Sequence, residues 1–209
     1  MNVIAEIKRA SPSRGVINKD IDPVAQAKKY VGGGAAAISV LTEPEYFMGS
    51  FTELVDVREA VTVPVLRKDF IIDECQVYET GVAAADAVLL IVAAMPPGDL
   101  EALMAIADHL GLDALVEIHT AEELRIAISA GASLIGVNNR DLYSLEVSLD
   151  VSRELIKHKP EGVLMVAESG ISTRDEIDEL RGLGFDGFLI GESLMRSPEI
   201  LASLIGGAA

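Results

Sequence analysis

The segment ALVEIHTAEELRIAISAGASLIGVNN, residues 114–139, covers one strand–helix–strand unit. Its apolar runs, at 113–117 and 133–137, are short and largely non-alternating, which is typical of strands buried on both faces. Between the runs, Thr120 precedes AEEL, with Glu123 three residues further on, and this capping-box pattern predicts the start of a helix. The segment therefore predicts two parallel strands joined by a helix.

The same unit recurs along the whole chain. We predict strands at 3–7, 35–41, 63–67, 86–92, 113–117, 133–137, 163–167 and 187–190. We predict helices at 22–32, 50–60, 73–84, 96–110, 120–130, 148–158, 173–183 and 197–205. Eight parallel strand–helix units of this size close into a (β/α)8 TIM barrel, an α/β fold. Residues 1–209 are expected to form a single domain, because no linker interrupts the repeat. An open doubly wound sheet is disfavoured, since no GxGxxG follows the first strand.

Helix boundaries carry further signals. Asp22 precedes Pro23, which is an N-cap followed by proline at the first helical position. Thr173, with Glu176 three residues on, repeats the capping-box pattern. Gly184 stands where a helix C-terminal glycine belongs. These signals support the predicted helix positions.

Composition restricts the class of protein. The net charge of −16 argues against nucleic acid and anionic membranes as partners. No apolar run reaches the ~18 residues of a membrane span, and no secretory signal pattern is present. Cys75 is the only cysteine, which fits a reducing compartment, and we interpret it as a helix-packing residue rather than a nucleophile. No spacing of His, Cys and Asp resembles a metal site. We therefore expect a cytoplasmic protein.

Charged residues stand at the ends of several predicted strands, where buried charge is costly unless it is paired or used. They are Glu6, Lys8, Lys68, Glu117 and Glu168. Because the strand ends of a barrel meet at one mouth, these residues predict an active site there. For single residues a structural role is the alternative: Glu6 and Lys8 could form an ion pair, and Lys68 could be a snorkelling side chain. Lys68 near carboxylates would make a good general acid, and Glu117 would balance the lysines, act as a base, or do both.

Three further motifs follow predicted strands. GVNNRD places Asn138 and Arg140 on one face, whereas we interpret Asn139 as a turn residue. AESGIS and LIGESLM end the seventh and eighth strands with small residues, where phosphate-binding barrels hold a phosphate on backbone N–H groups. Ser11, in the SPSRG loop, could add a hydroxyl group. His119 is expected near the mouth.

Seven motifs, taken in chain order, closely resemble those of indole-3-glycerol phosphate synthase of tryptophan biosynthesis. They are IAEIKRASPSRG, ISVLTEPEYFMGS, VLRKDFIID, LVEIH, GVNNRDL, VAESGIS and LIGESLMR. The resemblance implies conversion of 1-(2-carboxyphenylamino)-1-deoxyribulose 5-phosphate to indole-3-glycerol phosphate, with release of carbon dioxide and water. It implies no cofactor and no metal, and a small anionic partner that carries a phosphate and a carboxylate. We favour a monomer.

The resemblance also implies roles for single residues. Lys68 looks like the general acid that protonates the substrate ketone, and Lys8 like the lysine that contacts the anthranilate carboxylate. Glu117 looks like the base or proton relay of the dehydration. Glu6 and Asn138 resemble groups that orient the lysines and substrate hydroxyls, with Ser169 beside them. The other matches are substrate contacts: Ser11, Gly170, Gly191, Glu192 and Ser193 for the phosphate, Leu41, Phe47, Phe70 and Leu89 for the aromatic ring, and Arg140 and Glu168 elsewhere.

Family members usually carry several dozen residues ahead of the first strand, including a helix across the mouth, whereas Met1 and Asn2 stand there in this chain. We expect a wetter mouth and a raised KM. Two other functions compete. Phosphoribosylanthranilate isomerase relies on a Cys/Asp pair at strand ends, and the position of Cys75 in a predicted helix counts against it. The other is a non-catalytic phosphate-binding scaffold.

Overall fold

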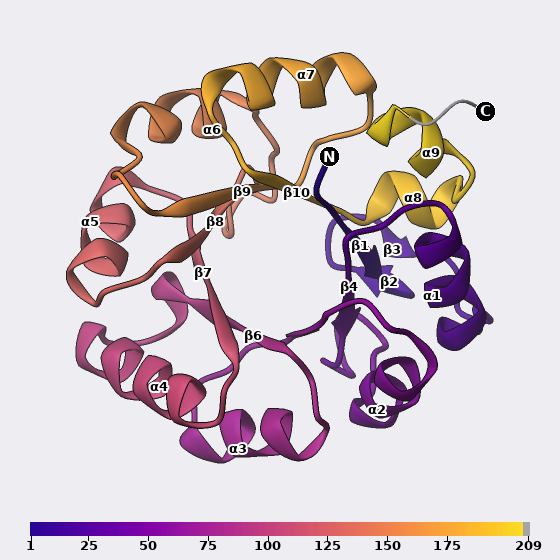
Figure 1. The fold of residues 1–209 in the computed structure, drawn as a ribbon, viewed down its shortest axis with the longest axis horizontal. Helices are drawn as coiled ribbons and strands as arrows, with labels where there is room; N and C mark the ends of the chain where they lie inside the picture. Colours follow the sequence, from indigo (N-terminus) through magenta and orange to yellow (C-terminus); the bar gives the residue numbers. More distant parts are fainter. Residues whose placement is uncertain (207–209) are drawn as a thin grey trace.

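The computed structural model describes residues 1–206, which form a closed ring of eight parallel strands with helices around it (Figure 1). The strands are β1 (Val3–Ile7), β4 (Ala37–Leu41), β5 (Val65–Lys68), β6 (Ala87–Ile91), β7 (Asp113–Ile118), β8 (Leu134–Asn138), β9 (Leu164–Glu168) and β10 (Gly187–Ile190). Each pairs in parallel with its neighbours in the chain, and β1 closes the ring by pairing with both β4 and β10. The predicted (β/α)8 barrel is confirmed, and every predicted strand overlaps an observed one.

Helices follow the strands on the outside of the ring. They are α1 (Pro23–Gly32), α2 (Phe51–Ala60), α3 (Glu74–Val82), α4 (Pro97–His109), α5 (Ala121–Ser129), α6 (Asp150–Leu155), α7 (Arg174–Leu183), α8 (Glu192–Arg196) and α9 (Ile200–Ile205). Two 3-10 turns, η1 (Val92–Ala94) and η2 (Ile156–His158), follow β6 and α6. The predicted helix at 148–158 is therefore α6 continued by η2.

The predicted helix caps form at the expected residues. The Asp22 carboxylate accepts the Ala25 N–H at 3.0 Å, and Thr173 forms a reciprocal capping box with Glu176. Gly184 ends α7 with φ at 116°, a left-handed conformation that favours glycine. At α5, Thr120 caps the helix as predicted. The Glu123 carboxylate, however, accepts the N–H of His119 instead of returning to Thr120.

Alternation along the strands divides the core into two layers. Inside the ring, a small apolar cluster consists of Leu66, Leu89, Ile91, Leu115, Val166 and Leu189. A larger cluster packs the outer faces of the strands against the helices. Along β5, Lys68 points into the ring, while Arg67 points outward and donates a hydrogen bond to the Gln76 carbonyl at 2.8 Å. Lys68 therefore reaches the mouth as predicted, whereas Arg67 connects the outer face of β5 to α3.

Three details differ from the prediction. The loop after β1 contains a short hairpin of β2 (Ala10–Ser11) and β3 (Gly15–Val16). The short helix α8 precedes α9, so the end of the chain has two helices where one was predicted. Cys75 is exposed in the first turn of α3. Its interpretation as a helix-packing residue is therefore wrong: the turn points its thiol away from the core.

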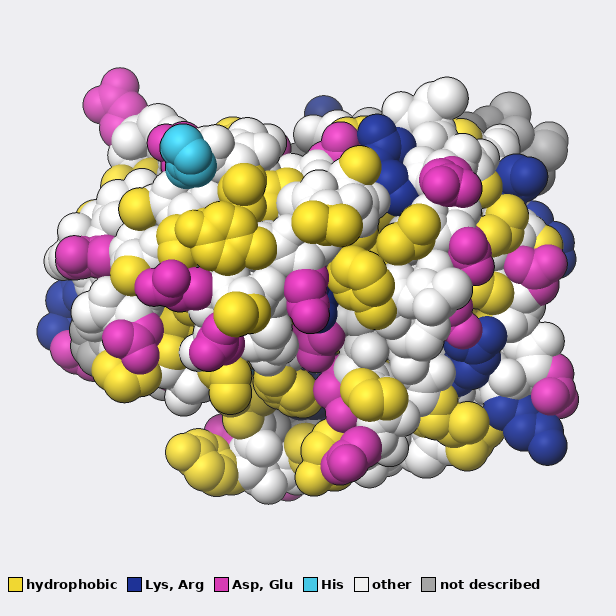
Figure 2. Space-filling view, turned by 90° about the horizontal axis from the view of Figure 1, so that it is seen from below, with side chains coloured by type: hydrophobic (Ala, Val, Ile, Leu, Met, Phe, Trp, Pro, Cys, Tyr) yellow, Lys and Arg dark blue, Asp and Glu magenta, His cyan; other side chains and the backbone are white. Residues whose placement is uncertain are grey.

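The outer surface mixes apolar and acidic side chains. Figure 2 shows the face at the bottom of Figure 1, where hydrophobic groups lie between Asp and Glu side chains, and Lys and Arg gather toward the edges. This distribution accords with the net charge of −16. No helix within residues 1–206 is both long enough and apolar enough to cross a membrane.

Candidate active site

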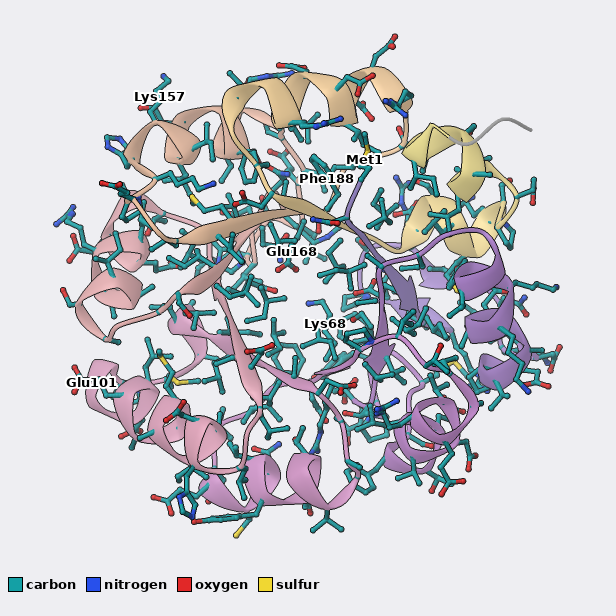
Figure 3. All side chains as sticks on the ribbon, viewed as in Figure 1. Met1, Lys68, Glu101, Lys157, Glu168 and Phe188 are labelled. Carbon is teal, nitrogen blue, oxygen red and sulfur yellow. The ribbon has the colours of Figure 1, made fainter. Side chains whose placement is uncertain are left out.

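A cavity of about 590 Å³ lies at the carboxyl ends of the strands, where Lys68, Asn138 and Glu168 are the last residues of β5, β8 and β9. Every site residue predicted from the sequence lines it. In chain order these are Glu6, Lys8, Ser11, Leu41, Phe47, Lys68, Phe70, Leu89, Glu117, Asn138, Arg140, Glu168, Ser169, Gly170, Gly191, Glu192 and Ser193. Lys68 and Glu168 both lie within the ring of strands, whereas Glu101 and Lys157 lie on the outer helices (Figure 3).

Lys68 is the centre of a cluster of charges. Its Nζ lies 3.2 Å from Glu117 Oε2 and 3.7 Å from Glu168 Oε2. Burial acts to lower the pKa of Lys68, but the carboxylates of Glu117, Glu168 and Glu6 outweigh it and raise the pKa above the usual lysine range. The ammonium form of Lys68 therefore persists at neutral pH and has a proton to donate.

Glu117 is held on both oxygens. Its Oε1 accepts a hydrogen bond from Asn138 Nδ2 at 3.0 Å and lies 3.3 Å from His119 Nε2, while Oε2 faces Lys68. Burial acts to raise the pKa of Glu117, but Lys68, His119 and Asn138 together hold it well below its usual range. The cluster thus offers an ionised carboxylate beside a protonated lysine.

Lys8 and Glu6 form the second charged pair of the mouth. Lys8, the first residue after β1, has its Nζ 2.6 Å from Oε1 of Glu6, which lies two residues before it. Gly191 lies against this pair, and a Cβ added there would collide with the Glu6 carboxylate and lie 3.0 Å from Lys8 Nζ. Glycine at this position therefore allows the end of β10 to approach the pair closely.

Glu168 is a buried carboxyl group of a different kind. It is 1% exposed, and neither of its oxygens has a hydrogen-bond partner among the described residues. Burial raises the pKa of Glu168 to about 8; Lys68 works against this rise, and the carboxylates of Glu117 and Glu6 add to it. The cavity therefore contains one ionised and one protonated inner carboxyl group near the same lysine.

Small residues line the side of the cavity formed by the ends of β9 and β10. Ser169 and Gly170 both have positive φ, 63° and 81°, and form the sharp turn after Glu168. Gly191 caps α8, and Ser193 Oγ donates a hydrogen bond to the Ile171 carbonyl at 3.1 Å, which ties the two strand ends together. Arg14, from the hairpin after β1, reaches Glu192 with Nε 3.0 Å from Oε1. This side has the small-residue character of a phosphate site.

An apolar wall faces that side. The rings of Phe47 and Phe70 are tilted by 50° with centroids 6.2 Å apart, and Leu41 and Leu89 lie beside the same cavity. The Glu43 carboxylate organises the loop that carries Phe47, because its oxygens accept the backbone N–H groups of Glu45, Tyr46 and Phe47 at 2.7–3.0 Å. Sequence reasoning missed Glu43, since nothing in the spacing of TEPEYF distinguishes it from Glu45.

Asn139 and Arg140 follow β8, and His119 follows β7. Asn139 was interpreted as a turn residue, but it is 1% exposed and bridges three elements. Its Nδ2 donates to the carbonyls of Glu168 and Ser169, and its Oδ1 accepts the Ser152 N–H of α6. His119 does lie behind the mouth, where it contacts Glu117. Alternation from Glu117 was the available signal for that contact. Arg140 lines the cavity and donates to the Leu145 carbonyl at 2.9 Å.

Among the described residues, no group of three or more His, Cys, Asp or Glu side chains is arranged to hold a metal ion. A parallel barrel with a lysine and paired carboxylates at the carboxyl ends of its strands has the construction of a (β/α)8-barrel enzyme. The sequence profile described as indole-3-glycerol phosphate synthase matches residues 1–204. The chain belongs to this family, and the resemblance seen in its motifs is confirmed.

Relatives support the same assignment. The chain is 51% identical to the indole-3-glycerol phosphate synthase of Lachnoclostridium phytofermentans, over 94% of this chain and 73% of that protein. It is 50% identical to that of Chlorobium limicola, over 96% and 78%, and 49% identical to that of Syntrophobacter fumaroxidans, over 100% and 80%. Among solved structures, a thiamine phosphate pyrophosphorylase from Pyrococcus furiosus superposes with a TM-score of 0.70 at 20% identity, covering 98% of this chain and 93% of that one. At that identity the similarity concerns the fold alone.

Proposed function

We propose that this chain catalyses the formation of indole-3-glycerol phosphate from 1-(2-carboxyphenylamino)-1-deoxyribulose 5-phosphate, as a carbon–carbon lyase of the carboxy-lyase class. The observation that carries the proposal is the Lys68–Glu117 pair, 3.2 Å apart, in a cavity that has an apolar wall on one side and small residues on the other. The substrate has three matching parts: an aromatic ring, a reacting ketone and a phosphate.

In the proposed ring closure, the aromatic carbon that carries the carboxylate bonds to the ketone carbon. Lys68 donates its proton to the ketone oxygen as negative charge develops there, and an ammonium group at that position stabilises the charge. Phe47 and Phe70 hold the ring, while the segments after β9 and β10 hold the phosphate, so the chain folds the substrate into a reactive geometry. Lys8 contacts the carboxylate until it leaves.

Loss of carbon dioxide then returns its electron pair to the ring and restores aromaticity. In the dehydration, Glu117 takes a proton from the carbon next to the nitrogen, and the hydroxyl group leaves as water after receiving a proton from solvent. Transfer of the proton from Glu117 to Lys68 then restores both groups. Asn138 supports this role because its hydrogen bond fixes the Glu117 carboxylate. The whole reaction takes up one proton from solvent, because the negatively charged carboxylate leaves as neutral carbon dioxide.

The test is to incubate the purified chain with the substrate and follow the fluorescence of indoleglycerol phosphate. Product formation above the Lys68→Met background supports the proposal. Absence of product with the parent chain favours a non-catalytic barrel. Phosphoribosylanthranilate isomerase activity is disfavoured, because Cys75 is exposed on α3 and is not among the residues that line the cavity. The monomeric state and cytoplasmic location expected from the sequence stay predictions.

A further inference from the structure

His119 stands between two carboxylates just behind the cavity. Its Nε2 lies 3.3 Å from Glu117 Oε1, and its Nδ1 lies 3.1 Å from Glu123 Oε2. The His119 side chain is 10% exposed, and the residue is not among those that line the cavity. His119 therefore acts on the substrate indirectly, and Glu117, which lines the cavity, connects the two.

The orientation of the imidazole is fixed by the start of α5. Glu123 Oε2 accepts both the Nδ1 contact and the backbone N–H of His119, the latter at 2.7 Å. Glu123 is itself held by Thr120, whose Oγ1 accepts the Glu123 N–H at 3.1 Å. The turn between β7 and α5 thus fixes the imidazole so that Nε2 lies at ion-pair distance from Glu117 Oε1, without hydrogen-bond geometry between the two atoms.

The surroundings favour the cationic form of His119. Glu117 faces it from β7 and Glu123 faces it from α5. Asp141, in the loop after β8, lies close enough for the charge of His119 to lower its pKa. Burial acts to lower the pKa of His119, but Glu117 and Glu123 outweigh it and raise the pKa to about 9. An imidazolium places a positive charge between the two carboxylates, with Nδ1 hydrogen-bonded to Glu123 and Nε2 at ion-pair distance from Glu117.

For the dehydration step, His119 supplies Glu117 with a second neighbouring cation besides Lys68. Lys68 becomes neutral when it gives its proton to the ketone oxygen, so Glu117 then loses the charge on its principal partner in a buried site. Building on the proposed function, we propose that His119 is a positioning residue that keeps the Glu117 carboxylate ionised and fixed while Lys68 is neutral, so that Glu117 remains a base for the dehydration.

The test compares His119→Gln, which keeps an amide donor and loses the cation, with the parent chain. The kcat of the variant is expected to fall about tenfold, and the acidic limb of its kcat profile to move up by about one pH unit. KM should change less than about twofold, because the ring does not touch the substrate. Glu123→Gln, which releases the imidazole, should act in the same direction. The matched control is His158→Gln, at an exposed residue of η2, which should leave kcat, KM and the acidic limb unchanged.

A uniform loss of kcat at every pH would indicate a merely structural role and overturn the proposal, as would a parent-like profile. A second measurement does not depend on activity. The His119 imidazole is titrated by NMR in the parent and in Glu117→Gln. Its midpoint should lie near 9 in the parent and move toward the ordinary histidine value in the variant. An unchanged midpoint would overturn the pairing. A parent chain that forms no indoleglycerol phosphate would overturn the proposed function instead, while the titration still decides the pairing.

Discussion

Lys68 stays charged in a place where burial alone would favour the neutral amine. Two opposing effects act on the residue: loss of solvation disfavours the ammonium, and three carboxylates favour it. The carboxylates prevail, chiefly that of Glu117 at 3.2 Å from Nζ; Glu168, at 3.7 Å, adds its charge only as it ionises near pH 8. The cost of this arrangement falls on Glu168, which has no hydrogen-bond partner among the described residues and is held protonated.

Substitutions of the two lysines at the mouth should have different kinetic effects, one on kcat and the other on KM. Lys68→Met removes the proton donor but keeps the length of the side chain, so kcat is expected to fall by about 10²–10⁴-fold with a smaller change in KM. Lys8→Met should instead raise KM through the lost carboxylate contact. Steady-state kinetics on both variants provides the measurement. If Lys68→Met keeps kcat within a few-fold of the parent, Lys8 becomes the better candidate for the acid.

Glu168 should make stability depend on pH. Its folded pKa is raised, so the contribution of the protonated group is complete below the unfolded value and is lost as pH rises toward about 8. Glu168→Gln keeps the neutral shape and does not titrate. The variant should therefore gain stability relative to the parent by up to about 1.4 kcal/mol per pH unit between the two pKa values. Urea unfolding from pH 5 to pH 9 measures the difference, and a constant difference would contradict the prediction.

At the scale of elements, the site depends on turns that the strands and helices hold in place. The turn after β9 has two consecutive residues with positive φ, Ser169 and Gly170. The positive φ of Ser169 has a conformational cost that glycine would not have, and the side chain of Asn139 offsets it by donating to the consecutive carbonyls of Glu168 and Ser169. In the loop after β4, Glu43 plays a comparable part for Phe47.

Asn139→Ala should therefore destabilise the fold and disturb the site together. The Ser169 carbonyl and the Ser152 N–H lose their partner, whereas the Glu168 carbonyl keeps the backbone N–H of residue 139; each unsatisfied buried group costs about 1–3 kcal/mol. We expect a loss of about 2 kcal/mol or more in the free energy of unfolding, measured in urea. Asn18→Ala, on an exposed loop, is the control. A loss below about 0.5 kcal/mol, which is usual for surface positions, would show that the bridge is dispensable.

At the scale of the whole molecule, an acidic chain places its cations selectively. The net charge is −16, yet Lys8, Lys68, Arg14 and Arg140 all line one cavity. The barrel produces this arrangement, because it turns the carboxyl end of every strand toward the same mouth. Acidic residues line the same cavity, so an anionic substrate meets individual cations there and not a cavity of net positive charge.

The proposed chemistry uses side chains alone, so removal of metal ions should leave it intact. Dialysis against EDTA is expected to leave kcat and KM of the whole chain unchanged within error, with or without added Mg²⁺ or Zn²⁺. The readout is the fluorescence assay before and after chelation. A fall in activity that Mg²⁺ or Zn²⁺ restores would contradict the prediction and require a metal in the mechanism.

The sequence by itself determined the barrel fold and which residues lie at its mouth. Non-alternating apolar runs mark strands buried on both faces, and caps such as Asp22 and Thr173 depend on local hydrogen bonds, so both could be predicted from short segments. The strand-end positions of Lys68 and Glu117 followed from the same periodicity. Their neighbours, for example Glu168 beside Lys68, were predicted only as members of a common mouth.

Only the tertiary structure decided how these groups pair and what charge each carries. The contacts of Lys68 with Glu117 and Glu168 join strands far apart in the chain, and the pKa of each group depends on burial that no local pattern specifies. The predictions that Asn139 is a turn residue and that Cys75 packs in a helix interface were wrong for the same reason. A residue type and its spacing give the direction of a side chain. The solvation of that side chain and the charges beside it are set only when the strands close into the barrel.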